Sequence, residues 1–173
     1  MHFFKKVNIL FLREKKKKVF FMYIVLPNIC NVLLIGMILS YNAMKDWVST
    51  EIDIPFSIIG FAGCLLEMFA FNEINMYNII TGFTIGLVPF LALALFGKCG
   101  GGDVIIMSLL GIVIGGPTLL YTIVFSLALY ILYGIIQIIK APTNQKSKVL
   151  KEQYPFIPFV LGGWCLTVIL SFI

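Results

Sequence analysis

The sequence predicts an all-α fold, a polytopic integral membrane protein with about six transmembrane helices. Of its 173 residues, 60% are hydrophobic and only 12% are charged. Apolar stretches near the length that spans a bilayer recur along the chain, separated by short polar or glycine-rich connections. No polar stretch is long enough for a separate soluble domain, so residues 22–173 are expected to form one membrane domain.

The apolar pattern divides this domain into six candidate spans, at residues 19–40, 54–71, 77–96, 103–115, 118–139 and 156–173. The fourth span is short because Gly115, Gly116 and Pro117 interrupt it, and it is expected to form a tight helical hairpin with the fifth. Glycines four residues apart predict close helix packing in the third and fourth spans: Gly82 with Gly86, and Gly111 with Gly115.

Basic residues indicate the orientation. With this span count, the segments near Asp46, near Asp103 and at 140–151 share one side of the membrane. Their lysines mark that side as cytoplasmic by the positive-inside rule: Lys45, Lys98, Lys140, Lys146, Lys148 and Lys151.

The basic N-terminal segment, residues 1–21, contradicts this orientation because it would fall on the opposite side. Three explanations remain open: an additional inserted helix at 7–12, a basic tail that tolerates the outer face, or translation that starts at Met22. We favour the start at Met22, which removes the conflict.

Several chemistries are poorly supported by the sequence. His2 is the only histidine and lies at the terminus, which argues against a Ser-His-Asp triad or a histidine metal site. The four cysteines are isolated, so neither a zinc motif nor a disulfide framework is indicated. The lysine clusters indicate topology rather than nucleic-acid binding.

Two aspartates remain as catalytic candidates. Asp46 follows the first span, while Asp103 follows the glycines Gly100, Gly101 and Gly102 and opens the fourth. Singly, Asp46 is a solvated loop charge paired with Lys45, and Asp103 is an N-cap after a flexible turn. Together at one membrane surface they cannot both ionise cheaply, so one keeps a proton while the other activates water.

The block at residues 96–104, FGKCGGGDV, resembles the GxGD aspartyl proteases that process type IV prepilins and archaeal preflagellins. Further matches are Ile52, six residues after Asp46, and the run YPFIPF at 154–159 before the last span. The family usually has proline directly after that isoleucine. Here Asp53 takes its place, and Asp53 is kept as an alternative to Asp46.

The resemblance implies a membrane-embedded aspartyl endopeptidase of the short, peptidase-only form, without a metal or cofactor. Its expected substrates are type IV prepilin-like precursors, Flp-type or archaellin-like, cleaved after glycine in the basic leader at the cytoplasmic face of the cell membrane. Glu51 and Asp53 could attract that leader, or could be an ordinary exposed charge pair. The alternatives are a small transporter or channel, with Asp46, Asp103 and Glu67 as ion ligands, and a noncatalytic pilus-assembly factor.

Other polar and aromatic residues have structural expectations. Glu67 lies thirteen residues after Ile54, which places it about 20 Å away along a helix, too far to join the aspartates. Glu67 and Glu73 are therefore expected near the opposite interface. Tyr41 and Trp47 are expected at the membrane interface, with Trp164 inside the last span.

Overall fold

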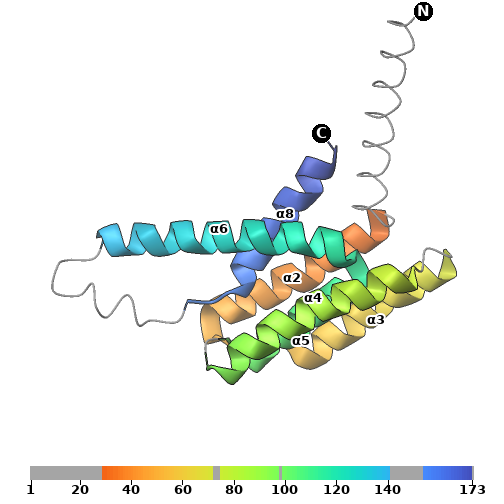
Figure 1. Cartoon of the computed structure of the whole chain (residues 1–173), viewed down its shortest axis with the longest axis horizontal. Helices are drawn as coiled ribbons and strands as arrows, with labels where there is room; N and C mark the ends of the chain where they lie inside the picture. Colours follow the sequence, from red (N-terminus) through yellow and green to blue (C-terminus); the bar gives the residue numbers. More distant parts are fainter. Residues whose placement is uncertain (1–28, 72–74, 98, 141–153, 173) are drawn as a thin grey trace, which may run out of the picture.

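The computed structural model describes residues 29–71, 75–97, 99–140 and 154–172. This part of the chain is all-helical, as the sequence predicts (Figure 1). The helices are α2 (Ile29–Ser49), α3 (Ile54–Ala70), α4 (Met76–Leu95), α5 (Gly101–Ile114), α6 (Gly116–Lys140) and α8 (Ile157–Phe172). The basic segment 1–21, the proposed start at Met22, and Glu73 lie outside the described residues.

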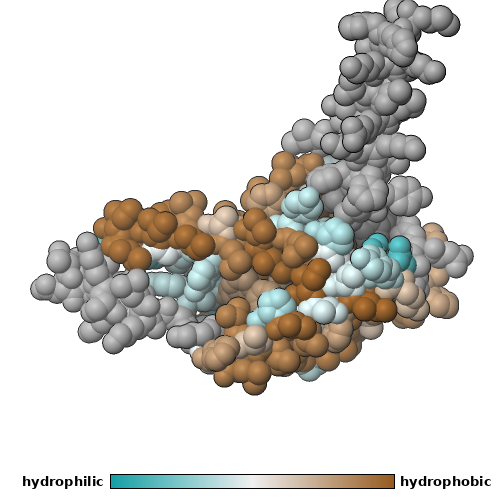
Figure 2. Space-filling view, viewed as in Figure 1, coloured by the Kyte–Doolittle hydropathy of each residue, from teal (hydrophilic) through white to brown (hydrophobic). Residues whose placement is uncertain are grey.

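Two helices, α4 and α6, are long and apolar enough to cross a membrane. Their 20 and 25 residues correspond to about 30 and 37 Å. Helices α3 and α5 are shorter and also apolar. Figure 2 shows apolar side chains over much of the visible face along α6 and α4. Leu91 of α4 and Leu132 and Ile139 of α6 are exposed. Such a surface supports membrane association.

Helix α2 continues well past its predicted end at residue 40 and stops at Ser49. Asn42 and Asp46, four residues apart, are both buried. The polar stretch therefore still presents one face to the bundle, which is why the helix continues through it. Thr50 ends it with a φ of +53°, a left-handed conformation common after a helix.

Helices α4 and α5 lie side by side with their backbones in contact (Figure 1). A Cβ atom added at Gly82 would overlap the carbonyl oxygen of Gly111, and one at Gly86 would overlap that of Met107. Only glycine permits this approach. The close packing predicted from the glycine spacing is confirmed at this interface.

Helix α8 packs on both α6 and α2. Gly163 lies against α6, where an added Cβ atom would overlap Ser126 Oγ and lie 2.6 Å from Thr122 O. Gly36 of α2 lies against the ring of Trp164, 3.3 Å from an added Cβ atom. Trp164 is buried inside the last helix, as predicted. Glycines thus set the spacing of α8 against both neighbours.

Gly115 alone separates α5 from α6. Its φ of 79° and ψ of 163° extend the chain, so α6 leaves in a different direction. Helix α5 packs mainly on α4 and α3, whereas α6 packs mainly on α8 and α4. The tight hairpin predicted for the fourth and fifth spans is therefore wrong.

The glycine contact between α4 and α5 can be tested with Gly82→Ala. Its methyl group would meet the Gly111 backbone, which cannot move aside as a flexible side chain can. We expect the free energy of unfolding to fall by about 1–3 kcal/mol. Thermal and denaturant unfolding in detergent micelles would measure the change.

Gly63→Ala in α3 is the matched control. An added Cβ atom at Gly63 has no neighbouring atom within 4 Å, so this variant should be at least as stable as the wild type. Equal stability of the two variants would contradict a backbone contact at Gly82.

Candidate active site

Asp46 lies near the end of α2 and is only 6% exposed. Its Oδ2 accepts the backbone N–H of Ile157, the first residue of α8, at 3.0 Å. The backbone of Phe156 also donates to this carboxyl group. The alternative of a solvated charge paired with Lys45 is wrong, because Lys45 Nζ lies 3.0 Å from Asp53 Oδ2 instead.

Asp103 lies in the first turn of α5, which begins at Gly101. Its Oδ2 accepts the N–H of Gly100 at 3.1 Å, and its own N–H donates to Gly100 O at 3.1 Å. This reciprocal pair resembles a capping box, with Gly100 in the N-cap position. The prediction that Asp103 is itself the N-cap after a flexible glycine turn is therefore wrong, since Gly101 and Gly102 are already helical.

The start of α5 approaches the segment that joins α2 to α3. A Cβ atom added at Gly102 would lie 2.9 Å from Ile52 Cδ1 and 3.0 Å from Ile52 Cβ. In this arrangement the charge of Asp103 is near enough to act on the carboxyl group of Asp46. The fold thus brings the start of α5, which carries Asp103, close to the segment that follows Asp46 in α2.

The three glycines before Asp103 have different surroundings. Gly102 gives room to Ile52, and a Cβ atom at Gly100 would lie 3.3 Å from Asp103 Oδ2. Gly101 is exposed and would meet no atom within 4 Å. One side of this turn is therefore open to a molecule from outside.

Asp53 is the N-cap of α3. Its Oδ1 accepts the N–H of Phe56 at 3.1 Å, while its Oδ2 pairs with Lys45. The hydrogen bond from Lys45, and then that from Phe56, hold the pKa of Asp53 below its usual range. Pro55 follows inside the first turn of α3, where proline is favoured. Asp53 thus has a capping role that a proline in its place could not fill.

The two candidate partners of Asp103 therefore differ in their contacts. Asp53 bonds to Lys45 and the start of α3, whereas Asp46 bonds to α8 and feels the charge of Asp103. These contacts favour Asp46 as the partner. Glu51 is exposed beside them, so the expected charge pair of Glu51 and Asp53 is instead a pair of Asp53 with Lys45.

Asn42 is a structural residue of the site that the sequence analysis did not single out. It is fully buried one turn before Asp46. Its Nδ2 donates to Ser57 Oγ at 3.0 Å, and its Oδ1 accepts the N–H of Asp53 at 3.1 Å. Asn42 therefore fixes the segment between α2 and α3. Its spacing of four residues from Asp46 was the available signal.

Cys99 is the second contact of Asp103. Its Sγ lies 3.3 Å from Asp103 Oδ2. Burial, followed by the charge of Asp103 and this hydrogen bond, raises the pKa of the Cys99 thiol to about 12. The thiol is therefore protonated at neutral pH and can donate to the Asp103 carboxyl group.

Glu67 does not join the two aspartates. It lies thirteen residues along α3 from Ile54, which corresponds to about 20 Å. Its Oε1 is buried and lacks a hydrogen-bond partner, as do both amide atoms of Asn31 in α2. Within the described ranges, no group of three or more His, Cys, Asp or Glu side chains could hold a metal ion.

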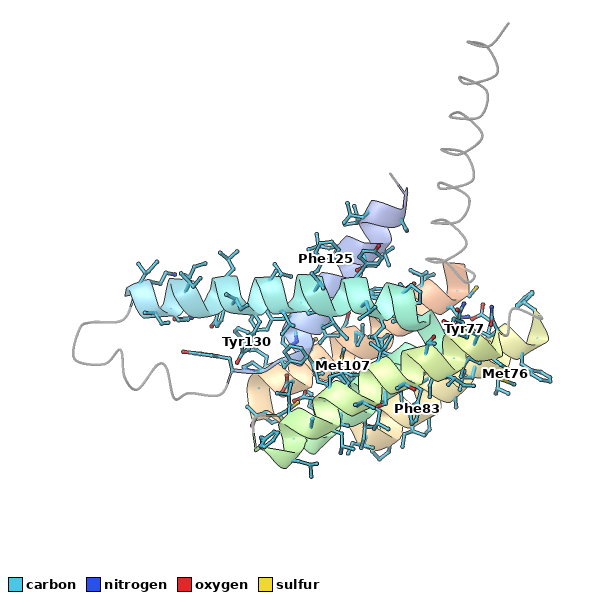
Figure 3. All side chains as sticks on the ribbon, viewed as in Figure 1. Met76, Tyr77, Phe83, Met107, Phe125 and Tyr130 are labelled. Carbon is cyan, nitrogen blue, oxygen red and sulfur yellow. The ribbon has the colours of Figure 1, made fainter. Side chains whose placement is uncertain are left out.

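Aromatic rings surround the end of α2 and the start of α8. Trp47 is exposed, and its ring centroid lies 6.3 Å from that of Tyr133. Tyr130 of α6 is labelled in Figure 3. Its ring centroid lies 6.0 Å from that of Phe156 and 5.3 Å from that of Phe159. These contacts hold α6 against the turn that bonds to Asp46.

No family model matches this chain, and neither the curated proteins nor the solved structures contain a significant match to it.

The pairing of Asp53 with Lys45 predicts a pH-dependent stability. Because folding lowers the pKa of Asp53, its stabilisation is complete above the ordinary aspartate pKa of about 3.9 and is lost as the pH falls through the folded value. Asp53→Asn keeps a capping side chain but loses the charge. The difference in Tm between wild type and variant should therefore stay constant from pH 7 to about pH 4 and shrink as the pH falls further. A difference that also stays constant below about pH 4 would contradict the ion pair.

The contact between Cys99 and Asp103 predicts a change in thiol reactivity. Burial, which raises the pKa of the Cys99 thiol most, remains in Asp103→Asn, but the variant loses the hydrogen-bond acceptor of the thiol and the negative charge that Asp103 carries at mildly alkaline pH. Alkylation of Cys99 at that pH should therefore accelerate several-fold. The rate would be measured by mass spectrometry after the exposed Cys30 and Cys165 are replaced by serine. Unchanged reactivity would show that Asp103 does not control this thiol.

Proposed function

We propose that this chain is a membrane-embedded aspartyl endopeptidase that removes the basic leader from type IV prepilin-like precursors. The observation that carries the proposal is the approach of the start of α5, which carries Asp103, to the segment that follows Asp46 in α2. These residues lie far apart in the sequence, and both are held by hydrogen bonds at helix ends in an apolar bundle. The resemblance to the GxGD proteases rests on the same two residues.

The proposed chemistry is hydrolysis by a pair of carboxyl groups that share one proton. The ionised carboxylate takes a proton from water as the water oxygen bonds to the peptide carbonyl carbon. The protonated carboxyl group gives its proton to the carbonyl oxygen. The C–N bond of the resulting intermediate then breaks as the departing nitrogen takes a proton from the pair, and a hydroxyl group of the intermediate returns a proton to the pair as the new carboxyl group forms.

The proposed substrate combines a short basic leader with an apolar helix. Glu51 is exposed near the aspartates and supplies negative charge for the leader. The exposed Gly101 leaves the turn before Asp103 open on one side. An extended peptide could approach there while its apolar helix stays in the bilayer. The resemblance supports Flp-type or archaellin-like precursors with cleavage after glycine.

The proposed setting is the cytoplasmic membrane, with six spans and the aspartates at the cytoplasmic face. Helices α4 and α6 have the length and composition of spans. In this arrangement the shorter α3 and α5 are tilted or partly covered by their neighbours. The lysines near Asp46 and Asp103 support the cytoplasmic orientation.

One observation favours a second function, that of a small ion transporter. Glu67 Oε1 is buried without a hydrogen-bond partner, and an ionisable residue within a span commonly marks an ion pathway. Ion flux in vesicles of the purified protein, abolished by Glu67→Gln, would support this alternative. Glu67 lies about 20 Å along α3 from the level of the aspartates, so it would form a separate site.

The protease proposal predicts that Asp46→Asn and Asp103→Asn each reduce leader cleavage by about a hundred- to ten-thousandfold. The assay is coexpression with a precursor that carries a basic leader, a glycine and an apolar helix, with cleavage followed by mass. Membrane insertion of each variant is checked in the same cells.

Asp53→Asn distinguishes the two possible partners of Asp103. This variant keeps the cap of α3 and is expected to cleave the precursor. Cleavage retained in Asp46→Asn but lost in Asp53→Asn would overturn the assignment of Asp46, and cleavage retained in Asp103→Asn would overturn the pair.

A further inference from the structure

Two prolines shape the turn that opens α8. The first turn of a helix leaves its backbone N–H groups without helical partners. Pro155 and Pro158 have no N–H, and the N–H groups of Phe159 and Val160 both bond to Phe156 O, at 3.0 and 3.2 Å. Only the N–H groups of Phe156 and Ile157 remain free to bond elsewhere. The two prolines thus concentrate the donors of this turn on two adjacent residues.

Both of these donors are used by one carboxyl group. Ile157 N lies 3.0 Å from Asp46 Oδ2, and the Phe156 backbone donates to the same side chain. Ile157 is fully buried, so water does not compete for its N–H. Asp46 acts here as a capping residue for a helix that begins more than a hundred residues later.

Asp103 has a weaker set of donors. Its Oδ2 accepts one backbone N–H, from Gly100, together with the thiol of Cys99. A thiol is a weak donor. The helix dipole favours negative charge on both residues, on Asp46 at the N-terminus of α8 and on Asp103 at that of α5, so it does not distinguish them. Hydrogen bonds to a carboxylate favour its ionised form. The negative charge of the pair is therefore better stabilised on Asp46 than on Asp103.

We propose that the Phe156 and Ile157 amides hold Asp46 as the ionised member of the pair, which makes Asp46 the base that takes the proton from water and Asp103 the acid. This assignment rests on the proposed protease function. Phe156 and Ile157 act through Asp46 and are positioning residues. The two prolines then contribute to the chemistry, because they leave these two N–H groups as the donors that bond to the base.

Among the described residues, other charged groups around Asp46 do not supply the same effect. Lys45 on α2 is already paired with Asp53. The titratable side chains on the elements packed against this end are Asp103 of α5, Tyr130, Tyr133 and Lys140 of α6, and Tyr154 before α8. Asp103 is the one whose charge acts on Asp46.

Ile157→Pro and Ile157→Ala form a matched pair of variants. Both shorten the same buried side chain, but only proline removes the N–H, and proline is tolerated at the first position of a helix. We expect Ile157→Pro to move the acid limb of the pH profile of cleavage upward by about one pH unit. Ile157→Ala should leave that limb in place. If the acid limb lies at the same pH in the two variants, the proposal is overturned.

A second substitution covers the case in which Ile157→Pro does not fold. Replacing the amide of residue 157 by an ester removes the N–H and keeps the isoleucine side chain. It should move the acid limb in the same direction as Ile157→Pro. An acid limb at the same pH as in the wild type would overturn the proposal.

A spectroscopic titration separates this proposal from the protease function. Isotope-edited infrared spectra of labelled aspartate, with Asp46→Asn as the assignment control, report the ionisation of Asp46 without any substrate. Loss of the N–H at residue 157 should move the Asp46 midpoint to higher pH even if the wild type cleaves no precursor. A midpoint that does not move would overturn the role of α8, whereas absent cleavage by the wild type would overturn only the protease.

Discussion

The hydrogen bond from Ile157 N–H to Asp46 Oδ2 is the contact on which the rest of the arrangement depends. It joins the end of α2 to the start of α8, and both residues are buried. Losing one partner would leave a buried donor or carboxylate unsatisfied, at a cost of about 1–3 kcal/mol or more. Because α8 also packs on α6, this bond links the positions of α2, α8 and α6 along their axes. Any movement of α8 along α6 would change the position of the Ile157 N–H relative to the Asp46 carboxyl group.

The position of Asp103 depends on a different constraint, the backbone contact of α4 with α5. Gly82 and Gly111 allow carbonyl groups and Cα atoms to meet where any side chain would separate the helices. Helix α5 is therefore fixed against α4 along its length, while Gly102 lets its first turn approach Ile52. Separate parts of the fold thus position the two carboxyl groups. Asp46 is positioned by α2 and α8, and Asp103 is positioned by α4 and α5.

The sequence predicted the features that depend on local pattern. Apolar stretches predicted an all-helical chain, and glycine spacing predicted the contact at Gly82. The errors came from long-range partners. Residues 41–49 look like a polar loop until α8 and α3 supply partners for Asp46 and Asn42, which then lie on the inner face of a helix. Asp53 could not be assigned from its position after Ile52, because its role depends on Lys45 eight residues away across a turn.

The location of the paired carboxyl groups at helix ends also follows from the cost of charge in an apolar medium. An ionised carboxylate in mid-bilayer has few donors available, whereas a helix N-terminus offers free N–H groups and a favourable dipole. Asp46 uses the N-terminus of α8, and Asp103 uses that of its own helix. Within the part of the chain that the structure describes, Lys45 pairs with Asp53, and no basic side chain pairs with Asp46 or Asp103. A lysine or arginine bonded to either carboxylate would hold it ionised and oppose the sharing of a proton. Backbone donors in unequal number instead favour the charge on one member while leaving the proton on the other, which is the state that acid-base hydrolysis requires.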